Sequence, residues 1–318
     1  MSIVDCIIEQ KSKILVIGDI MLDRFIFGEV NRISPEAPVP VVRFSKEKYE
    51  LGGCGNVVRN LVGLGAKPTT ISIVGDDLNG DKILNEFNQM GLSSAKIIKS
   101  KKSGTTVKMR IVGDRQQIVR VDYDENHEKD ISNASKDNLI NIDMSKMDGV
   151  IISDYNKGVC NQKFLKKIFE SAKLFNIPIF VDPKGNEWRK YYGANIITPN
   201  RREAEIIIGS DLISKKDYEQ AGIEICKRFN ISSCLITKGS EGMSYISDQN
   251  IFHLASKAKE IFDVSGAGDT VISCVALAIV AGIAPKKAVD FSNKAAGIVV
   301  GHLGTSAITI DELKRNEN

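Results

Sequence analysis

The sequence predicts an α/β protein with three layers, in which helices cover both faces of a mostly parallel central sheet. Short apolar segments that suit buried strands alternate with helical segments along most of the 318 residues. The composition, with 42% hydrophobic and 26% charged residues, is that of a chain with a substantial core. No repeat or low-complexity linker interrupts the pattern, so we expect one domain over residues 1–318.

The first strand is predicted at 13–18, where Lys-Ile-Leu-Val-Ile-Gly is apolar enough to be buried on both faces. Further strands are predicted at 69–74, 148–153, 177–181, 194–197 and 233–237. Helices are predicted at 56–64, 81–90, 162–175, 201–208, 217–229, 269–281 and 285–300. Almost no polar side chain follows Thr270 up to residue 281, which predicts a buried helix there.

Two segments break this alternation. Residues 25–49 are rich in Val, Phe and Pro and show no helical period, and residues 105–123 alternate like a hairpin around a Gly113-Asp-Arg turn. Together they predict a small antiparallel β flap, or lid, over about 22–49 and 104–124, inserted in the core. An exposed sheet edge needs cover from substrate or from a second subunit, so we expect a homodimer through the flap.

The charge balance gives no argument for nucleic-acid binding, because 43 basic and 40 acidic residues leave a net charge of only +3. Six cysteines form no C-x-x-C pair, which suits reduced thiols in the cytoplasm, and the three histidines lack metal-ligand spacing. Acidic residues near the N-terminus argue against a signal peptide, and the longest apolar stretch, 271–284, is too short to cross a bilayer. We therefore expect a soluble cytoplasmic protein.

A Gly-rich turn, Asp263-Val-Ser-Gly266-Ala267-Gly268-Asp269, precedes the buried helix. Free N–H groups at a helix N-terminus and the positive end of the helix dipole predict an anion site there. Asp269 would then accept a proton from the group that attacks the bound anion. The helix dipole is expected to lower the pKa of Asp269 and keep it ionised. The alternative is an ordinary helix start, in which Asp269 only stabilises the dipole.

Polar residues follow the apolar segments at positions where strands are expected to end. Because the carboxyl ends of parallel strands meet at one edge of an open sheet, these side chains should converge on a ligand. Each alone is weak evidence, since loops often begin with Asp or Asn. The six positions are Asp19, Asp154, Asp182, Asn200, Lys238 and Asp263.

Several common nucleotide and hydrolase motifs are absent. The sequence contains no G-x-x-x-x-G-K-[ST], no G-x-G-x-x-G after the first strand and no G-x-S-x-G. Four other motifs, in order along nearly the whole chain, resemble the PfkB, or ribokinase-like, carbohydrate kinases. They are Gly52-Gly53-x-x-Asn56, Asn200-Arg-Arg-Glu203, Thr237-Lys-Gly239-x-x-Gly242 and Asp263-x-x-Gly266-Ala-Gly-Asp269. This resemblance implies a ribokinase-like fold and an ATP-dependent sugar kinase that uses Mg²⁺.

Within that family, five further segments resemble the D-glycero-β-D-manno-heptose 7-phosphate kinases. They are Asp19-Ile-Met-Leu-Asp23-Arg, the run at 32–41, Ser153-Asp-Tyr-x-Lys157-Gly, Val181-Asp-Pro-Lys184 and Gly301-x-Leu-Gly-Thr305. Those enzymes act in ADP-heptose supply for lipopolysaccharide and are often fused to an adenylyltransferase, so this chain resembles their kinase half. Cys54-Gly55 and Val264-Ser265 depart from the usual residues, but the first pair stays small and Ser265 keeps a hydroxyl.

The resemblance implies that Asp269 is the catalytic base and that Gly266, Ala267 and Gly268 form the anion hole for the transferring γ-phosphoryl group. Glu203 would hold Mg²⁺ directly or through water, unless it is only a first-turn helix acid. Asp263 and Ser265 would bind a monovalent cation such as K⁺, unless Asp263 only braces the loop. Nucleotide contacts are expected from Asn200, Arg201, Arg202, Glu203, Lys238, Gly239, Gly242 and Asn293.

Asp19, Asp23, Gly52, Gly53 and Asn56 are expected to bind the sugar, the glycines by allowing its close approach. The substrate's own phosphate needs cations, for which the candidates are Arg110, Arg120, Lys157 and Lys184. The flap arginines could equally be solvated.

The predicted reaction is phosphorylation of O1 of heptose 7-phosphate to the 1,7-bisphosphate. One alternative is another PfkB-type substrate, such as a hexose phosphate or ribose. Another is a non-catalytic sugar-phosphate sensor with the same fold, although binding alone would not need the base Asp269. An NAD-dependent enzyme is disfavoured, because the glycine fingerprint is missing.

Overall fold

The computed structural model describes residues 2–94, 96–113, 116–136, 142–258, 260–302 and 304–316. Asp114 and Arg115 of the predicted hairpin turn, and Leu303 of the last motif, lie outside these ranges.

The main sheet joins nine strands of the described residues in the order β13-β12-β11-β10-β9-β8-β1-β4-β5. The pairs from β5 across to β11 are parallel, and β12 and β13 add two antiparallel strands at the other edge. The strands are β1 (Lys13–Gly18), β4 (Lys67–Gly75), β5 (Ile97–Ser100), β8 (Gly149–Ser153), β9 (Ile179–Asp182), β10 (Ile196–Ile197), β11 (Ser233–Thr237), β12 (Met243–Ser247) and β13 (Ile251–Leu254).

Two hydrophobic cores cover the two faces of this sheet, because successive strand residues point in opposite directions. On β1, Ile14 and Val16 enter one core while Leu15 and Ile17 enter the other. The first core packs α1 (Ile3–Gln10), α2 (Cys54–Gly63), α3 (Leu78–Gln89), α8 (Ala267–Val280), α9 (Pro285–Val299) and α10 (Ile310–Arg315). The second packs α4 (Glu128–Lys136), α5 (Gln162–Leu174), α6 (Arg201–Ile208) and α7 (Lys215–Phe229).

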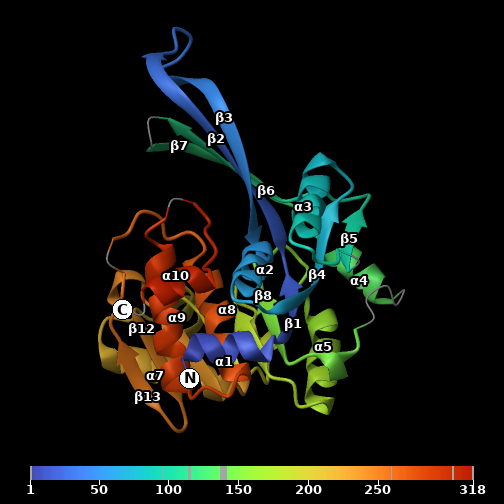
Figure 1. Ribbon diagram of the computed structural model, residues 1–318, viewed down its shortest axis with the longest axis vertical. Coiled ribbons are helices and arrows are strands. Elements are labelled where there is room, and N and C mark those ends of the chain that lie inside the picture. The colour runs from blue at the N-terminus through green and yellow to red at the C-terminus, as the bar shows by residue number, and fades with distance from the viewer. Residues whose placement is uncertain are drawn as a thin grey trace.

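A second sheet of four strands projects from this body, as Figure 1 shows. Its order is β3-β2-β6-β7, with β2 (Ile20–Ile33), β3 (Pro40–Gly53), β6 (Val107–Gly113) and β7 (Gln116–Tyr123). The pairs β2–β3 and β6–β7 are antiparallel hairpins, and β2 pairs with β6 in parallel. The predicted segments 22–49 and 104–124 hold most of these strand residues, and we refer to this sheet as the lid.

The predicted fold class is confirmed, and both α6 and β11 begin and end where the sequence predicts. One expected strand end is wrong. Ile261 and Phe262, which precede Asp263, belong to no strand and are 53% and 67% exposed. The short segments β5, β12, β13, α1, α4 and α10 were not predicted. Among the described residues, no helix combines the length and the hydrophobicity needed to cross a membrane.

Candidate active site

Asp269 lies in the first turn of α8, whose N-terminus reaches the carboxyl edge of the parallel strands. Gly266 caps this helix in the left-handed conformation, with φ of 81°. A Cβ on Gly266 would approach the Asn56 side-chain nitrogen to 2.5 Å, so only glycine fits. The predicted anion loop therefore has its helix N-terminus. However, the Ala267 N–H is not free as predicted, because it donates to the Val264 carbonyl at 3.3 Å.

The Asp269 carboxylate is only 2% exposed and accepts one hydrogen bond on each oxygen. The Asn56 amide donates to Oδ2 at 2.8 Å, and the Tyr155 hydroxyl donates to Oδ1 at 2.9 Å. Burial raises the pKa of Asp269 to about 6, although these two hydrogen bonds and the charge of Lys108 act in the opposite direction. The predicted lowering by the helix dipole is therefore wrong, yet a pKa of about 6 still leaves the carboxylate mostly ionised at pH 7.

Two carboxylates of the predicted sugar site lie nearby, and both have protein partners. Asp19 follows β1 and accepts the backbone N–H groups of Tyr155, Lys157 and Val159 at 2.8 to 3.1 Å. Burial and the neighbouring Asp154 raise the pKa of Asp19 to about 6. Asp23, on β2, accepts a hydrogen bond from the Thr305 hydroxyl and pairs with Arg110.

The glycines at the base of the lid have a structural reason that the sequence did not reveal. A Cβ on Gly52 would lie 2.3 Å from the Asp23 carboxylate, and one on Gly53 would lie 2.3 Å from the Asp19 carbonyl oxygen. Gly53 also has φ of 58°. In this structure the two glycines therefore let Asp19 and Asp23 lie close to the backbone at the base of the lid.

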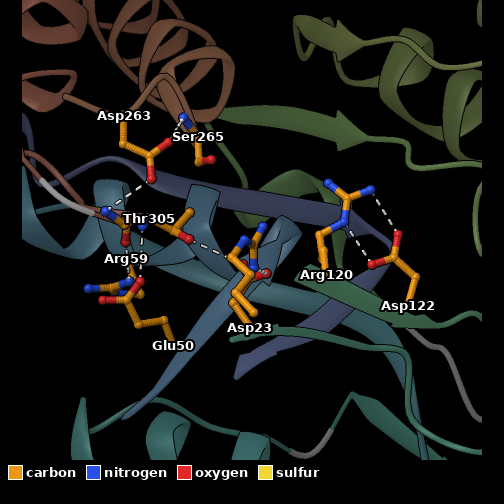
Figure 2. A network of polar contacts seen from close by, with 10 residues as sticks. Asp23, Glu50, Arg59, Arg120, Asp122, Asp263, Ser265 and Thr305 are labelled. Carbon is orange, nitrogen blue, oxygen red and sulfur yellow. Dashed lines mark hydrogen bonds and ion pairs between the residues drawn. The ribbon is translucent and has the colours of Figure 1, made fainter. Parts of the chain in front are cut away.

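Three cations of β6 and β7 lie on one face of the lid, which we call the inner face. Lys108 and Arg110 alternate on β6, Arg110 lies opposite Arg120 on β7, and Lys108 lies beside Asp23 of β2. The Arg110 side chain is 12% exposed and pairs with Asp23, while that of Arg120 is 49% exposed and pairs with Asp122 at 2.8 Å. Figure 2 shows the Arg120–Asp122 pair apart from Asp23. Of the two predicted arginines, only Arg110 reaches the buried site.

Lys108 was missed at the level of sequence. Its amine lies 5.7 Å from the centre of the Tyr155 ring, and burial lowers its pKa. Within the described part of the chain, no carboxylate comes within ion-pairing distance of this amine. The alternation of the hairpin places Lys108 two residues before Arg110, which is the signal that could have identified it. Lys157 also lies on this side, where its amine pairs with Asp124 at 2.7 Å.

A cavity of about 370 Å³ opens on the other side of the α8 N-terminus. Its walls come from the ends of β8 to β11, from the anion loop and from α9. Predicted residues that line it are Lys184, Asn200, Glu203, Gly239, Gly242, Ala267, Gly268 and Asn293. The size suits a small-molecule ligand, and three of the six predicted strand-end residues, Asp154, Asp182 and Asn200, converge here.

Glu203 reaches this cavity from a capping box at the start of α6. The Asn200 side chain accepts the Glu203 N–H, and the Glu203 carboxylate accepts the Asn200 N–H. Its other oxygen lies 2.8 Å from the Lys184 amine. Lys184, predicted on the sugar-phosphate side, therefore lies on the cavity side.

Asp182 shares the cavity with Glu203 and lies near Asp269. Burial and the charges of Asp269 and Glu203 raise its pKa well above the usual range for an aspartate. Among the residues that the structure describes, no three acidic, histidine or cysteine side chains come together to enclose a metal ion.

Three predicted nucleotide residues do not line the cavity. Arg201 pairs with Glu205 at 2.8 Å, and Arg202 is exposed. The Lys238 amine lies 5.0 Å from the centre of the Tyr218 ring. Arg201 also lies 3.6 Å from the Glu241 carboxylate, so these side chains contact protein groups outside the cavity.

Asp263 braces the anion loop. Its carboxylate accepts the N–H of Ser265 at 2.8 Å and that of Gly304 at 3.2 Å, as Figure 2 shows. Thr305 continues this network, because its N–H donates to Glu50 and its hydroxyl to Asp23. Since both Asp263 oxygens already serve backbone groups, this geometry favours the loop brace over the predicted monovalent-cation site.

A cavity at the carboxyl edge of a parallel sheet, with a helix N-terminus and a buried carboxylate at its end, suits transfer of an anionic group to a second substrate. The chain matches the family model described as "pfkB family carbohydrate kinase" over residues 11–312 and belongs to that family. It is therefore a carbohydrate kinase.

Its curated relatives include proteins named "Bifunctional protein HldE". The protein from a Nitratiruptor species is 39% identical over 97% of this chain and 65% of its own length. The protein from Sulfurimonas denitrificans is 39% identical over 96% of this chain and 64% of its own length. The chain thus spans slightly less than two thirds of these relatives.

Solved structures show the same fold. Phosphofructokinase-2 from Escherichia coli, in complex with potassium, superimposes with a TM-score of 0.77 and 18% identity over 96% of this chain and 97% of its own. Ribokinase from Arabidopsis thaliana, complexed with ribose and ATP, superimposes with a TM-score of 0.74. It is 16% identical in sequence and covers 96% of this chain and 98% of its own. The ribokinase-like fold is confirmed.

Proposed function

We propose that this protein transfers the γ-phosphoryl group of ATP to the anomeric O1 hydroxyl of D-glycero-β-D-manno-heptose 7-phosphate, giving the 1,7-bisphosphate for ADP-heptose and lipopolysaccharide core synthesis in the cytoplasm. The observation that carries the proposal is the position of Asp269. It lies between a cavity of nucleotide-compatible size and the cationic inner face of the lid. The HldE relatives and the resemblance to heptose 7-phosphate kinases support the choice of sugar.

In this reaction the sugar O1 attacks the γ-phosphorus while the bond to the ADP oxygen breaks. The O1 proton passes to Asp269, whose two oxygens each keep a lone pair beside the hydrogen bonds from Asn56 and Tyr155. The N-terminus of α8, at Gly266 to Gly268, faces the charge that develops on the transferring group. Asp269 is a weak base for an alcohol, so its orientation matters as much as its proton affinity.

The donor set around the cavity fits Mg²⁺. Asp182 and Glu203 bring two carboxylates into one region, where burial and the charges of Asp269 and Glu203 raise the pKa of Asp182. These carboxylates would hold the ion, directly or through water, together with the nucleotide phosphates. When bound, Mg²⁺ would neutralise charge on the β- and γ-phosphates. Lys184, which pairs with Glu203 in this structure, would turn to the phosphates.

The phosphate of the sugar would bind at the inner face of the lid. Lys108 is half-buried and has no carboxylate partner among the described residues, so it is available to an anion. Arg110 would add a second cation once its pairing with Asp23 is shared with substrate hydroxyls. Lys157 remains a candidate at the rim.

We also propose a homodimer through the opposite, outer face of the lid. Val119, Val121 and Tyr123 alternate with the inner-face residues of β7, and all three are exposed. A row of exposed apolar side chains on a projecting sheet needs cover, and a second lid would provide it.

Release of ADP with a panel of sugars and sugar phosphates tests the proposed function. The panel includes heptose 7-phosphate, the same heptose without phosphate, fructose 6-phosphate and ribose. Turnover restricted to heptose 7-phosphate is the expected result. Preference for another sugar would assign the chain to a different pfkB substrate, and tight binding without turnover would support the sensor alternative.

A further inference from the structure

Tyr155 holds the second oxygen of the Asp269 carboxylate, and it is not among the residues predicted to bind or react with a substrate. Its hydroxyl lies 2.9 Å from Oδ1, while Asn56 occupies Oδ2. Burial and the neighbouring carboxylates raise the pKa of Tyr155 well above its usual value, so the phenol keeps its proton and can only donate to the carboxylate. Tyr155 also lines the cavity and therefore stands at the junction of the two proposed substrate sites.

The loop that carries Tyr155 is held on both sides. On the sheet side, Asp19 accepts the N–H groups of residues 155, 157 and 159. On the lid side, the Lys157 carbonyl accepts the His127 N–H at 2.7 Å. Gly158, with φ of 99°, allows close packing against Glu128. In this geometry the buried Asp19 carboxylate therefore fixes the segment that aims Tyr155.

We propose that Tyr155 is a positioning residue for the catalytic base, which holds the Asp269 carboxylate in one orientation and favours its ionised form. The inference rests on the proposed role of Asp269. A hydroxyl that donates to a carboxylate stabilises the charge and prevents rotation about the last side-chain bond. With Asn56 on the other oxygen, the two hydrogen bonds fix the carboxylate plane and leave each oxygen a lone pair for the sugar hydroxyl.

Other groups around Asp269 also influence its ionisation. Asp23 of β2 and Asp182 of β9 oppose the negative charge, and Lys108 of β6 favours it. Cys54 of α2 lies close but keeps its proton, because burial raises its pKa. Among the described residues, Asn56 and Tyr155 donate side-chain hydrogen bonds to the Asp269 carboxylate. Tyr155 is the one of this pair that can be changed without altering a residue predicted to bind the sugar.

Tyr155→Phe removes the hydroxyl and leaves the ring. The acidic limb of kcat/KM against pH should move upward by about one pH unit, and kcat on the plateau should fall about tenfold. Tyr191→Phe is the matched control, because the Tyr191 hydroxyl donates to the buried Asp154 at 2.6 Å. Tyr191→Phe should lower thermal stability to a similar extent and leave the acidic limb in place.

A second variant keeps the test independent of folding. Replacing Tyr155 with 3-fluorotyrosine, a stronger donor, should move the limb to lower pH. Unchanged limbs in both Tyr155 variants would overturn the inference. Asp269→Asn in the same assay separates this failure from failure of the proposed base. If Asp269→Asn is inactive while the limbs stay unchanged, only the Tyr155 inference is wrong. If Asp269→Asn turns over normally, the assignment of the base is wrong.

Discussion

The Asn56 amide donates a 2.8 Å hydrogen bond to the Asp269 carboxylate across 213 positions of sequence. This contact joins the N-termini of α2 and α8, which pack side by side beneath the lid. It therefore links the motif predicted to bind the sugar with the motif predicted to bind the transferring phosphoryl group.

Asp269→Asn should lower kcat by about three orders of magnitude or more, because the amide cannot accept the O1 proton. Nucleotide affinity should change less than about threefold, since the cavity residues are untouched. Steady-state kinetics and calorimetric titration of a nucleotide analogue would measure the two effects. Turnover near the wild-type value would rule out Asp269 as the base.

The same substitution should make the protein more stable at neutral pH. The folded-state pKa of Asp269, about 6, lies above its ordinary value of 3.8, so the buried charge opposes folding above pH 6 and the penalty disappears as pH falls below 3.8. The raised pKa of Asp269 corresponds to a loss of about 3 kcal/mol in the free energy of unfolding at pH 7. The Asn variant should regain this amount, reduced by the weaker hydrogen bonds that its amide makes with Asn56 and Tyr155. Chemical denaturation at pH 7 and pH 5 should show a larger gain at pH 7. If the Asp269→Asn variant were less stable than the unchanged protein at both pH values, burial of the Asp269 charge would not be what opposes folding.

The activity of the unchanged protein should fall on the acidic side. If Asp269 must be ionised, kcat/KM should drop about tenfold per pH unit below pH 6 and level off above it. A pH profile with saturating nucleotide measures this. A limb centred near pH 4 would mean that the base is more exposed than the structure indicates.

Lys108→Met should raise KM for the sugar phosphate about 10- to 100-fold and leave KM for ATP within about twofold. Arg120→Met is the control on the same face of the lid, because Arg120 is exposed and already paired with Asp122. The loss should vanish when the heptose carries no phosphate. An equal loss with both sugars would place Lys108 at the transferring group instead.

Glu203→Gln should increase the Mg²⁺ concentration needed for half-maximal velocity about tenfold, because a carboxylate near the nucleotide phosphates is lost. Glu205→Gln, on the same helix but paired with Arg201, should behave as wild type. Equal Mg²⁺ dependence in all three proteins would leave Glu203 with its capping role alone.

Val119→Lys with Val121→Lys should convert the proposed dimer into monomer, since two charges would enter an apolar interface. Light scattering after size exclusion would report the mass. Leu174→Lys, at an exposed apolar position of α5, should not change it. A monomeric wild-type protein would contradict the proposed assembly.

The strand-end rule predicted half of its six residues correctly as cavity residues, because it depends only on chain order. Asp154, Asp182 and Asn200 converge on the cavity as expected. The rule failed at Asp263, where an apolar pair lies in an exposed loop and not in a strand. Apolar composition alone does not distinguish these two cases over so short a segment.

The other differences between the predicted and the observed site depend on which side chains pair with one another and on how deeply they are buried. Arg110 and Arg120 share one face and one register, yet Asp23 holds the first inside while Asp122 holds the second in solvent. Lys184 lies at the cavity and away from the lid, because its amine pairs with Glu203 at the start of α6. The pKa of Asp269 was given the wrong direction because burial depends on tertiary packing, which outweighs the helix dipole.

The hydrogen bond between Thr305 and Asp23 spans 282 positions and has a consequence for synthesis of the protein. As the chain leaves the ribosome, the lid and α2 emerge long before α8 and residues 304–305 exist to cover them. The apolar surfaces of the lid and α2 stay exposed until these late segments pack against them. Contacts between residues so distant in sequence form slowly. The nascent chain should therefore depend on chaperones until residues 304–305 have left the ribosome, and phosphotransfer can begin only after that point.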